Sequence, residues 1–404
     1  MKYRKAEHLN NAKYEIRGKV ADKAAQLKLR GINILELNIG NPGIFGFQVP
    51  DTMNMAIIRN LDKAAAYSDS KGIFAAREAI VIETQNIGIK GVDIDHVFLG
   101  NGVSELIMMS MEALLNPEEE VLIPSPDYPL WTAAVNIANG KAVHYNCDSE
   151  NDWQPDLEHM EAQISARTRA LVVINPNNPT GAVYSKETLE EITAIARRHR
   201  LIIFSDEIYS KILYDDIEHV PMAILSDDVL VVTFNGLSKS YRACGFRAGW
   251  LYLSGPVQQA EDYIDGLTQL LSMRLCSNVP AQWAIQTALG GNQSIYQLTA
   301  DGGRLKRQRD LTIKRLRAIE GISCVNPQSA LYAFPEIDLS LFDFDDDEDF
   351  IIKLLEEEHV LLVQGSGFNY DRSYAFRVVF LPHEETLNKA FDRLENFLSI
   401  HRKA

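Results

Sequence analysis

Cysteine is scarce in this chain, and its positions exclude two kinds of site. The 404 residues include four cysteines, none in the CxxC spacing of a redox centre or a zinc ligand pair. We therefore expect ordinary free thiols in a reducing compartment. The four are Cys147, Cys244, Cys276 and Cys324.

Positive charge is also in deficit. The formal net charge is -15, and the carboxylates are spread along the whole chain. A nucleic-acid surface needs a basic face, so we expect no nucleic-acid partner. The acidic run FDFDDDEDF at 342–350 has ligands suited to a cation, but runs of this kind usually form a solvated turn. We predict a solvated turn there and no metal site.

Long hydrophobic runs are missing. No segment approaches the roughly 18 apolar residues of a membrane helix, and the first residues, MKYRKAEHLNNAKYEIRG, lack the apolar centre of a secretion signal. We predict a cytoplasmic protein that neither crosses nor binds a membrane. Its hydrophobic content of 46% is enough for a large core.

Short apolar runs alternate with amphipathic segments, which favours an α/β fold. Most of these runs are apolar throughout, as in strands of a mostly parallel sheet that is buried on both faces. Between two of them, Ser185 precedes KETLEEITAIARRHR, whose apolar positions share one face of a predicted crossover helix. The predicted strands cover residues 96–100, 121–125, 171–176, 201–206, 229–234 and 249–254.

The sequence changes in character after residue 290. The basic amphipathic segment GGRLKRQRDLTIKRLRAIEG is followed by short strand-like pieces, SALYAFPEI and YAFRVVFL, which predicts a smaller α+β domain. The Gly/Pro-rich loop NIGNPGIFG separates the N-terminal segment from the large domain. We expect residues 1–46 to form an arm and part of the small domain, 47–290 the large domain, and 291–404 the small domain.

Residues that directly follow strands are candidates for a binding site, because ligands of such sheets bind beyond the carboxyl ends of the strands. Lys239 follows the strand at 229–234, and Arg247 comes eight positions later, so an amine and a guanidinium can meet one ligand with a carbonyl and a phosphate. By themselves the two would be solvated surface cations. Asp206 ends the strand at 201–206, where a carboxylate is costly unless it pairs with a buried cation. Tyr209 lies near it if the chain turns helically.

Two loops complete the motif set. The segment NPNNPTG, which contains Asn178, is a rigid turn at the carboxyl edge of the sheet. In GNGVSELI a strand leads into a helix, and the N–H groups of Val103 and Ser104 favour an anion there. An ordinary strand-to-helix turn with Ser104 as cap is the alternative.

The order and spacing of these motifs resemble the class I/II aminotransferases of fold type I, over nearly the whole chain. The resemblance implies pyridoxal phosphate as cofactor and transfer of amino groups between amino acids and 2-oxo acids. It also implies the fold, a large domain with a mostly parallel sheet plus a smaller α+β domain. By this similarity Lys239 holds the cofactor as a Schiff base and acts as general base. Asp206 binds the ring nitrogen, while Asn178 and Tyr209 bind the phenolic oxygen.

The same resemblance assigns the rest of the cofactor site. The phosphate would meet Val103, Ser104, Arg247 and the hydroxyl of Ser238, although relatives often have Ser or Thr where this chain has Gly236. Tyr128 would stack on the ring, with Trp131 as a core residue. Tyr67 would reach the phosphate of the other subunit, which implies a homodimer with shared sites. A surface loop tyrosine is the alternative for Tyr67.

Substrate residues follow from the similarity as well. Arg377 in SYAFRVVFL would clamp the substrate α-carboxylate, and the backbone of Gly40 would approach it. The aspartate-specific branch has a fixed arginine before an SN.PP segment, but here Arg274 is one residue out of register with it. We therefore expect Arg17, with Tyr14 beside it, to meet a distal carboxylate. An arginine that only anchors the N-terminal arm is the alternative.

Several pieces, among them YSDSKG and PDYPLWTAAV, resemble the bacterial glutamate–pyruvate, alanine-forming branch of the family. They imply exchange between L-alanine plus 2-oxoglutarate and pyruvate plus L-glutamate. An aspartate or broad-range aminotransferase and a pyridoxal-phosphate-dependent carbon–sulfur lyase remain as alternatives. A cofactor-sensing regulator is a further rival, but it would normally carry a DNA-binding domain.

Overall fold

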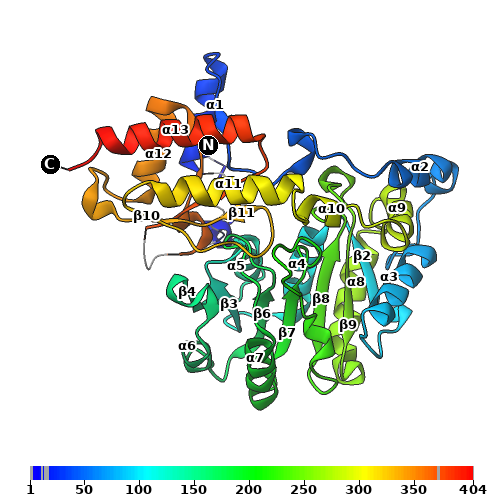
Figure 1. Ribbon diagram of the computed structural model, residues 1–404. Coiled ribbons are helices and arrows are strands. Elements are labelled where there is room, and N and C mark those ends of the chain that lie inside the picture. Colours follow the sequence, from blue (N-terminus) through cyan, green and yellow to red (C-terminus); the bar gives the residue numbers. More distant parts are fainter. Residues whose placement is uncertain (1–2, 11, 13–17, 371–373, 404) are drawn as a thin grey trace.

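A large mixed sheet forms the centre of the computed structural model, which describes residues 3–10, 12, 18–370 and 374–403 (Figure 1). The sheet has eight strands in the order β2-β9-β8-β7-β6-β3-β4-β5. Their bounds are β2 (Val97–Gly100), β3 (Glu120–Ser125), β4 (Lys141–Asp148), β5 (Gln154–Pro155), β6 (Thr168–Ile174), β7 (Ile202–Asp206), β8 (Val231–Gly236) and β9 (Gly249–Ser254).

Most strands of this sheet run in one direction. β4, β3, β6, β7 and β8 are parallel, whereas β9 runs antiparallel between β8 and β2, and β5 is antiparallel to β4. The predicted mostly parallel α/β sheet is confirmed. The sequence analysis did not predict β4, because this strand mixes polar residues such as Lys141 and Asn146 with apolar ones and is only partly buried.

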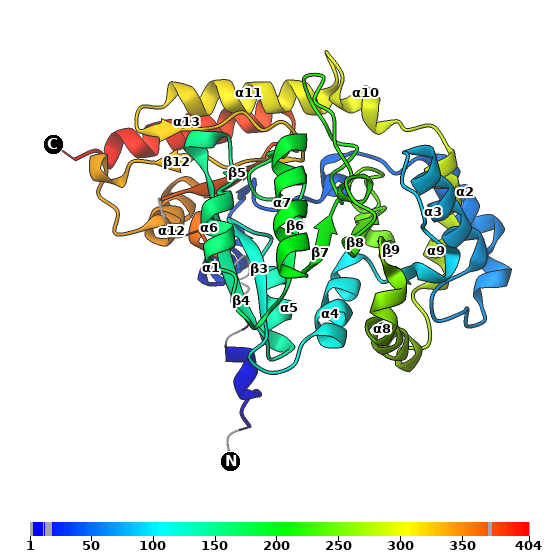
Figure 2. The ribbon, with the colours of Figure 1, turned by 90° about the horizontal axis from the view of Figure 1, so that it is seen from below.

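Helices cover both faces of the sheet (Figure 2). Alternate side chains of a strand point to opposite faces. In β6, Val172 therefore packs with α4 (Val103–Leu114), α5 (Leu130–Ile137) and α8 (Glu261–Met273), while Leu171 packs on α7 (Lys186–His199). Figure 2 shows α6 (Leu157–Ala162) and α7 on one side of the sheet and α4, α5 and α8 on the other.

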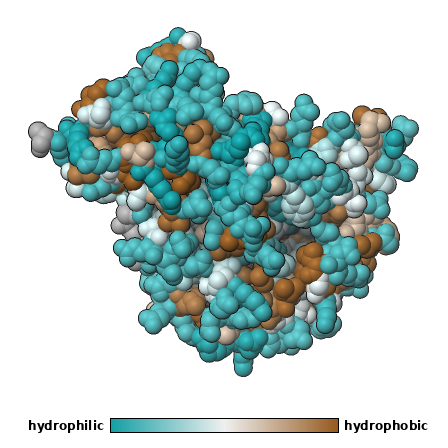
Figure 3. Space-filling view, viewed as in Figure 1, coloured by the Kyte–Doolittle hydropathy of each residue, from teal (hydrophilic) through white to brown (hydrophobic). Residues whose placement is uncertain are grey.

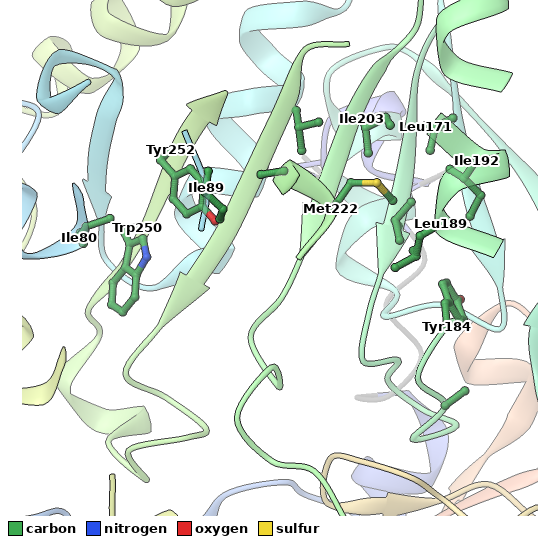
Figure 4. Close-up of a cluster of buried hydrophobic side chains, with 14 of the residues drawn as sticks. Ile80, Ile89, Leu171, Tyr184, Leu189, Ile192, Ile203, Met222, Trp250 and Tyr252 are labelled. Atoms are coloured by element: carbon green, nitrogen blue, oxygen red, sulfur yellow. The ribbon is translucent and has the colours of Figure 1, made fainter. Parts of the chain in front are cut away.

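The predicted crossover helix is confirmed as α7. Ser185 caps it by accepting a hydrogen bond from the Thr188 N–H, and Arg200 ends it in a left-handed conformation. Leu189 and Ile192 lie on the buried side of α7, beside Leu171 (Figure 4).

The sheet edge at β2 and β9 is covered by a second group of helices. They are α2 (Asp51–Arg59), α3 (Phe74–Asn86) and α9 (Val279–Gly290), and α9 packs on both α2 and α3. Trp250 and Tyr252 extend from the same face of β9 toward Ile80 of α3 (Figure 4).

The N-terminal and C-terminal segments pack together in a separate layer, seen at the upper left in Figure 1. α1 (Lys19–Leu29) contacts α12 (Asp347–Glu358), and β1 (Leu35–Glu36) pairs in parallel with β13 (Val360–Leu361). This packing supports the domain limits at residues 46 and 290, which stay a prediction. The remaining elements are α10 (Ile295–Thr299), α11 (Arg304–Ala318), α13 (Glu384–Ile400), β10 (Ile322–Ser323), β11 (Tyr332–Ala333), β12 (Glu336–Ile337), β14 (Val363–Gln364) and β15 (Phe376–Val379).

The acidic run at 342–350 differs from the prediction of a solvated turn. Its second half begins α12, where Asp346 accepts a hydrogen bond from the Asp349 N–H. Asp347 is buried and accepts from the N–H and hydroxyl of Ser366. Carboxylates are favoured at a helix N-terminus, so a helix start explains part of this charge. Within the described ranges no cluster of metal-binding side chains occurs.

None of the helices in the described part of the chain is both long and apolar enough to cross a bilayer. The location expected from the sequence stays a prediction.

Candidate functional site

Lys239 lies where the large sheet meets the N-terminal loop. It follows β8, and its Nζ donates a hydrogen bond of 2.7 Å to the carbonyl oxygen of Gly40. The same Nζ lies 6.0 Å from the ring centre of Tyr209. Gly40 has to be a glycine, because a Cβ there would lie 2.1 Å from the hydroxyl oxygen of Tyr332. The amine is thus held at a junction of three distant segments.

Asp206 is the last residue of β7, with only 3% of its surface exposed. Its carboxylate accepts hydrogen bonds from Trp131 Nε1 at 3.1 Å and from the Ile208 N–H at 3.3 Å. Burial raises its pKa to about 6, although both hydrogen bonds act in the opposite direction. Lys239 also lowers this pKa, so the two groups interact. A cation bound against Asp206 would restore the charged form.

Tyr209 and Tyr332 form a buried pair of phenols. Their hydroxyl oxygens are 2.7 Å apart, and each residue is 2% exposed. Burial raises the pKa of Tyr209 well above its ordinary value, and Tyr332 raises it further. The sequence analysis missed Tyr332, because it stands in the strand-like piece SALYAFPEI and has the pattern of a core residue there.

Arg377 in β15 is fixed on several sides. Its Nη1 donates to Asn178 Oδ1 at 2.9 Å and its Nη2 to the Asn38 carbonyl oxygen at 2.7 Å. The guanidinium carbon also lies 4.4 Å from the ring centre of Tyr332 and 4.7 Å from that of Phe368. The structure therefore brings together Arg377 and Asn178, as the predicted roles require.

The NPNNPTG loop that carries Asn178 is rigid because its own side chains bind it internally. Asn177 Oδ1 accepts from both the N–H and the hydroxyl of Thr180. Gly181 has a φ of +73°, and a Cβ there would lie 2.6 Å from Pro327 Cβ. Close contact with the 327–329 segment thus requires glycine.

The start of α4 forms an anion-binding arrangement with Arg247. No side chain caps this helix at Gly102, so the first N–H groups, including those of Val103 and Ser104, are open to a ligand. Arg247 lies directly over Gly102, since a Cβ there would be 2.3 Å from its Nη2. The guanidinium is exposed and donates to the carbonyl oxygens of Cys244 and Asn101. The backbone donors and the cation therefore converge on one point.

The other predicted residues differ in burial and in their contacts. Ser238 and Tyr128 are half-buried, and the Ser238 carbonyl oxygen accepts from Cys244 Sγ. Trp131 is a core residue, as predicted, but it also donates to Asp206, which the sequence did not indicate. Tyr67 is 79% exposed. Tyr14 and Arg17 lie outside the described residues.

Replacing Arg377 with glutamine is expected to lower kcat/KM for carboxylate substrates by about 10²-fold. The effect should fall mainly on KM, because the guanidinium would bind the carboxylate before and during the reaction alike. Steady-state kinetics with several substrates measure it, and Arg377→Lys serves as the control that keeps the charge but lacks the planar fork. A change of less than about threefold in Arg377→Gln would remove Arg377 from the binding site.

Comparison with known proteins gives close matches over the whole chain. Glutamate-pyruvate aminotransferase AlaA of Escherichia coli (strain K12) is 53% identical over 395 residues, covering 98% of each chain. Alanine aminotransferase of Mycobacterium bovis is 52% identical, covering 98% of this chain and 92% of the relative. A crystal structure of an aminotransferase from Escherichia coli superimposes with a TM-score of 0.98 at 52% identity, covering 100% of both chains.

The family assignment follows from the match that covers most of the sequence. The description of the matching family is aminotransferase class I and II, and the match spans residues 32–394. Together with relatives above 50% identity, it explains why the motifs stand in this order. The chain belongs to the class I and II aminotransferase family.

Proposed function

We propose that this enzyme exchanges the amino groups of glutamate and alanine, interconverting L-alanine plus 2-oxoglutarate and pyruvate plus L-glutamate. Members of its family are pyridoxal-phosphate-dependent transferases that act on amino acids and 2-oxo acids. The observation that carries the substrate proposal is the identity of 52–53% to relatives named glutamate-pyruvate aminotransferase and alanine aminotransferase, which match 98% of this chain.

The side chains of the candidate site fit pyridoxal phosphate. A ring nitrogen that is protonated needs a buried carboxylate, and Asp206 is one, at the carboxyl end of the central strand β7 and with a raised pKa. A phosphate needs donors, which the start of α4 and Arg247 supply. An aldehyde needs an amine, and the Lys239 amine is close enough to Asp206 to lower its pKa. When bound, the cofactor supplies a carbonyl that takes up the amino group and a ring that accepts electrons.

The residues of this chain have distinct tasks in the proposed reaction. Arg377 holds the substrate α-carboxylate in two-point contact, which fixes the direction of the Cα–H bond. The Lys239 amine removes the proton from Cα and returns one later, acting as general base and then as general acid. Asp206 would keep the ring nitrogen protonated, and Asn178 and Tyr209 would donate to the phenolic oxygen. Tyr128 would pack against the ring face.

Glutamate has a distal carboxylate and alanine has none. An enzyme that accepts both needs a distal cation that can move away or be solvated when alanine is bound. Arg274 is already engaged, because it bonds Glu105 at 2.9 Å and the carbonyl oxygens of Ser70 and Leu99. This supports Arg17 as the group for the distal carboxylate of glutamate, with Tyr14 beside it.

Replacing Arg17 with methionine is expected to raise the KM for glutamate by about fivefold, because one charge pair in contact with solvent typically contributes roughly 1 kcal/mol. Alanine has no distal carboxylate, so its KM should change less. Steady-state kinetics for both amino donors test this, with Arg274→Met as the comparison. An unchanged KM for glutamate together with normal turnover of alanine would reject Arg17.

We also propose a homodimer in which Tyr67 reaches the phosphate site of the partner subunit. Tyr67 is exposed in the isolated chain, and the nearby side chains of Phe74, Met273 and Leu275 are 52–67% exposed. The two segments lie side by side, because Ser272 and Arg274 bond Ser70. An apolar surface of this kind is usual where a second subunit binds.

Replacing Met273 with glutamate is expected to weaken the dimer by at least about tenfold, because a carboxylate would be buried at the contact. Sedimentation velocity over a range of concentrations measures it. Ile400→Glu is the matched control, since Ile400 is 66% exposed at the end of α13, against 67% for Met273. A dimer of unchanged affinity in Met273→Glu would place the contact elsewhere.

A panel of amino donors tested against pyruvate and 2-oxoglutarate examines the function itself. We expect glutamate with pyruvate and alanine with 2-oxoglutarate to give the highest kcat/KM, ahead of aspartate and branched-chain donors. Cystathionine without any oxo acid is the control for lyase activity. Release of pyruvate and ammonia from cystathionine at a comparable rate would favour the lyase instead.

A further inference from the structure

A second cavity lies beside the candidate site and shares backbone segments with it. Its volume is about 510 Å³, and it is bounded by α3, the end of α9, the segment at 213–224 and the strands β8 and β9. Small-molecule sites in proteins typically have volumes of roughly 300–1,000 Å³. Figure 3 shows hydrophobic side chains among hydrophilic ones on the face that carries β8 and β9.

The wall of this cavity contains carboxylates that are held in place. Glu207 accepts hydrogen bonds from Ser205 Oγ and the Met222 N–H, and its Oε2 lies 3.2 Å from His219 Nε2. Glu83 accepts from Lys211 Nζ at 2.7 Å. Burial lowers the pKa of Lys211, but Tyr241 and Glu83 raise it more, so this side chain stays cationic.

The charges of the wall do not balance. Glu83, Glu207 and Glu218 line the cavity together with one ammonium, that of Lys211. The three carboxylates outnumber the one ammonium, and this excess of negative charge repels the carboxylates of amino acids and 2-oxo acids. The cavity is thus unsuited to a second molecule of substrate.

Two buried polar atoms in the wall have no partner of their own within the described part of the chain. The Ser240 hydroxyl oxygen and His219 Nδ1 form no hydrogen bond with any described residue. Ser240 is 2% exposed, the His219 side chain is 7% exposed, and both line the cavity. Buried polar atoms in proteins nearly always find a partner, so these two can serve a bound ligand. When the proton shared with Glu207 is on Nε2, Nδ1 accepts, and the Ser240 hydroxyl can accept or donate.

Four aromatic side chains also line the cavity. Trp250 and Tyr252 extend from β9 on the side of Ile80 (Figure 4), and Tyr241 and Tyr296 complete the aromatic part of the lining. The faces of such rings attract organic cations, and the attraction is strongest when water is excluded. Rings, carboxylates and unpaired acceptors therefore favour the same kind of ligand.

We propose that this cavity is an effector site for a small organic ammonium ion with an aromatic or branched apolar body. A ligand bound there would contact residues that directly follow catalytic residues in the sequence. Glu207 follows Asp206, Ser210 follows Tyr209, and Ser240 follows Lys239, and all three line the cavity. A ligand that orders these neighbours changes the positions of the catalytic groups.

The test uses three probes of nearly equal shape on the holoenzyme. They are N,N-dimethylphenethylamine, which is a cation, its neutral methyl ether analogue, and the anion 3-phenylpropionate. A tertiary amine cannot condense with an aldehyde, so the cation cannot react in the main site. We expect the cation to bind at least about tenfold more tightly than either analogue in isothermal titration calorimetry. We also expect it to shift the visible absorbance of the cofactor and still to bind when the main site is saturated with 2-oxoglutarate.

Ile224→Trp narrows the mouth of the cavity, because Ile224 lines it and is 44% exposed. The affinity of this variant for N,N-dimethylphenethylamine should be at least about tenfold lower than that of the wild type. Ile82→Trp is the matched control, since Ile82 is 49% exposed on α3 but does not line the cavity, and it should bind normally. Failure of the cation to bind, equal binding of the ether, normal binding by Ile224→Trp, or complete loss of binding in saturating 2-oxoglutarate would each overturn the site. Binding without a change in absorbance would overturn the coupling. Neither result bears on the proposed aminotransferase reaction, which is measured separately.

Discussion

Replacement of Lys239 by alanine is expected to lower kcat for amino transfer by at least about 10⁴-fold, the upper range for loss of a positioned general base. Two functions are lost together, because the same amine is proposed to bind the cofactor and to move the proton. The structure gives the physical reason, since Nζ is anchored on the Gly40 carbonyl oxygen and interacts with buried Asp206. Steady-state and single-turnover kinetics measure the loss.

Lys239→Arg is the matched control for this experiment. It keeps a cation near Asp206 but supplies neither a nucleophile nor a base at neutral pH. We expect it to be nearly as inactive as Lys239→Ala, while circular dichroism shows both variants folded. Turnover above about 1% of the wild-type rate in either variant would exclude Lys239 as the base.

Asp206→Asn is expected to have opposite effects on the apoprotein and on the cofactor-bound enzyme. In the structure, burial raises the pKa of Asp206 from 3.8 to about 6. The folded state thus binds this proton more tightly than the unfolded state does. Stability is therefore lost as the pH rises from about 4 to about 6, by about 3 kcal/mol in all, and stays lower above that window.

The asparagine variant removes this cost, so its apoprotein should unfold at higher urea concentration than wild-type apoprotein at pH 7.5. With pyridoxal phosphate present the order should reverse, because the ring nitrogen would lose its carboxylate partner. We expect kcat to fall by about 10²-fold or more. Urea unfolding at pH 4.5 and pH 7.5, with and without cofactor, measures both effects. A cofactor-bound variant as stable and active as wild type would show that Asp206 does not face the ring.

Local patterns in the sequence predicted the parts of the fold that depend on local chemistry. The buried strands are continuous apolar runs, and Ser185 begins α7 as a cap. β4 was not predicted, because a partly exposed strand has a mixed pattern. The helix start within 342–350 was also missed, since a run of carboxylates has the same composition in a turn and in a first helical turn.

In the candidate site, too, residues in local motifs could be predicted, whereas residues whose role depends on distant contacts could not. Lys239 and Asp206 could be predicted because each stands in a motif with fixed spacing, and Arg377 because the strand-like piece around it resembles the family. Tyr332 could not, because its role depends on contacts with Tyr209, which lies 123 positions earlier in the chain. Backbone acceptors such as the Asn38 carbonyl oxygen have no side-chain signature at all.

The cavity beside the site illustrates a further limit of sequence reasoning. Glu207, Ser210 and Ser240 are ordinary polar residues that follow the catalytic ones in sequence, and no motif marks them. Their importance arises only when α3 and the segment at 213–224 enclose them with aromatic rings.

One measurement tests the central proposal most directly. Purified protein is saturated with pyridoxal phosphate, reduced with borohydride, digested and analysed by mass spectrometry. The account predicts a yellow protein before reduction and, afterwards, one pyridoxyl group per chain on the peptide that contains Lys239. A protein that stays colourless, or a pyridoxyl group on a different lysine, would contradict it.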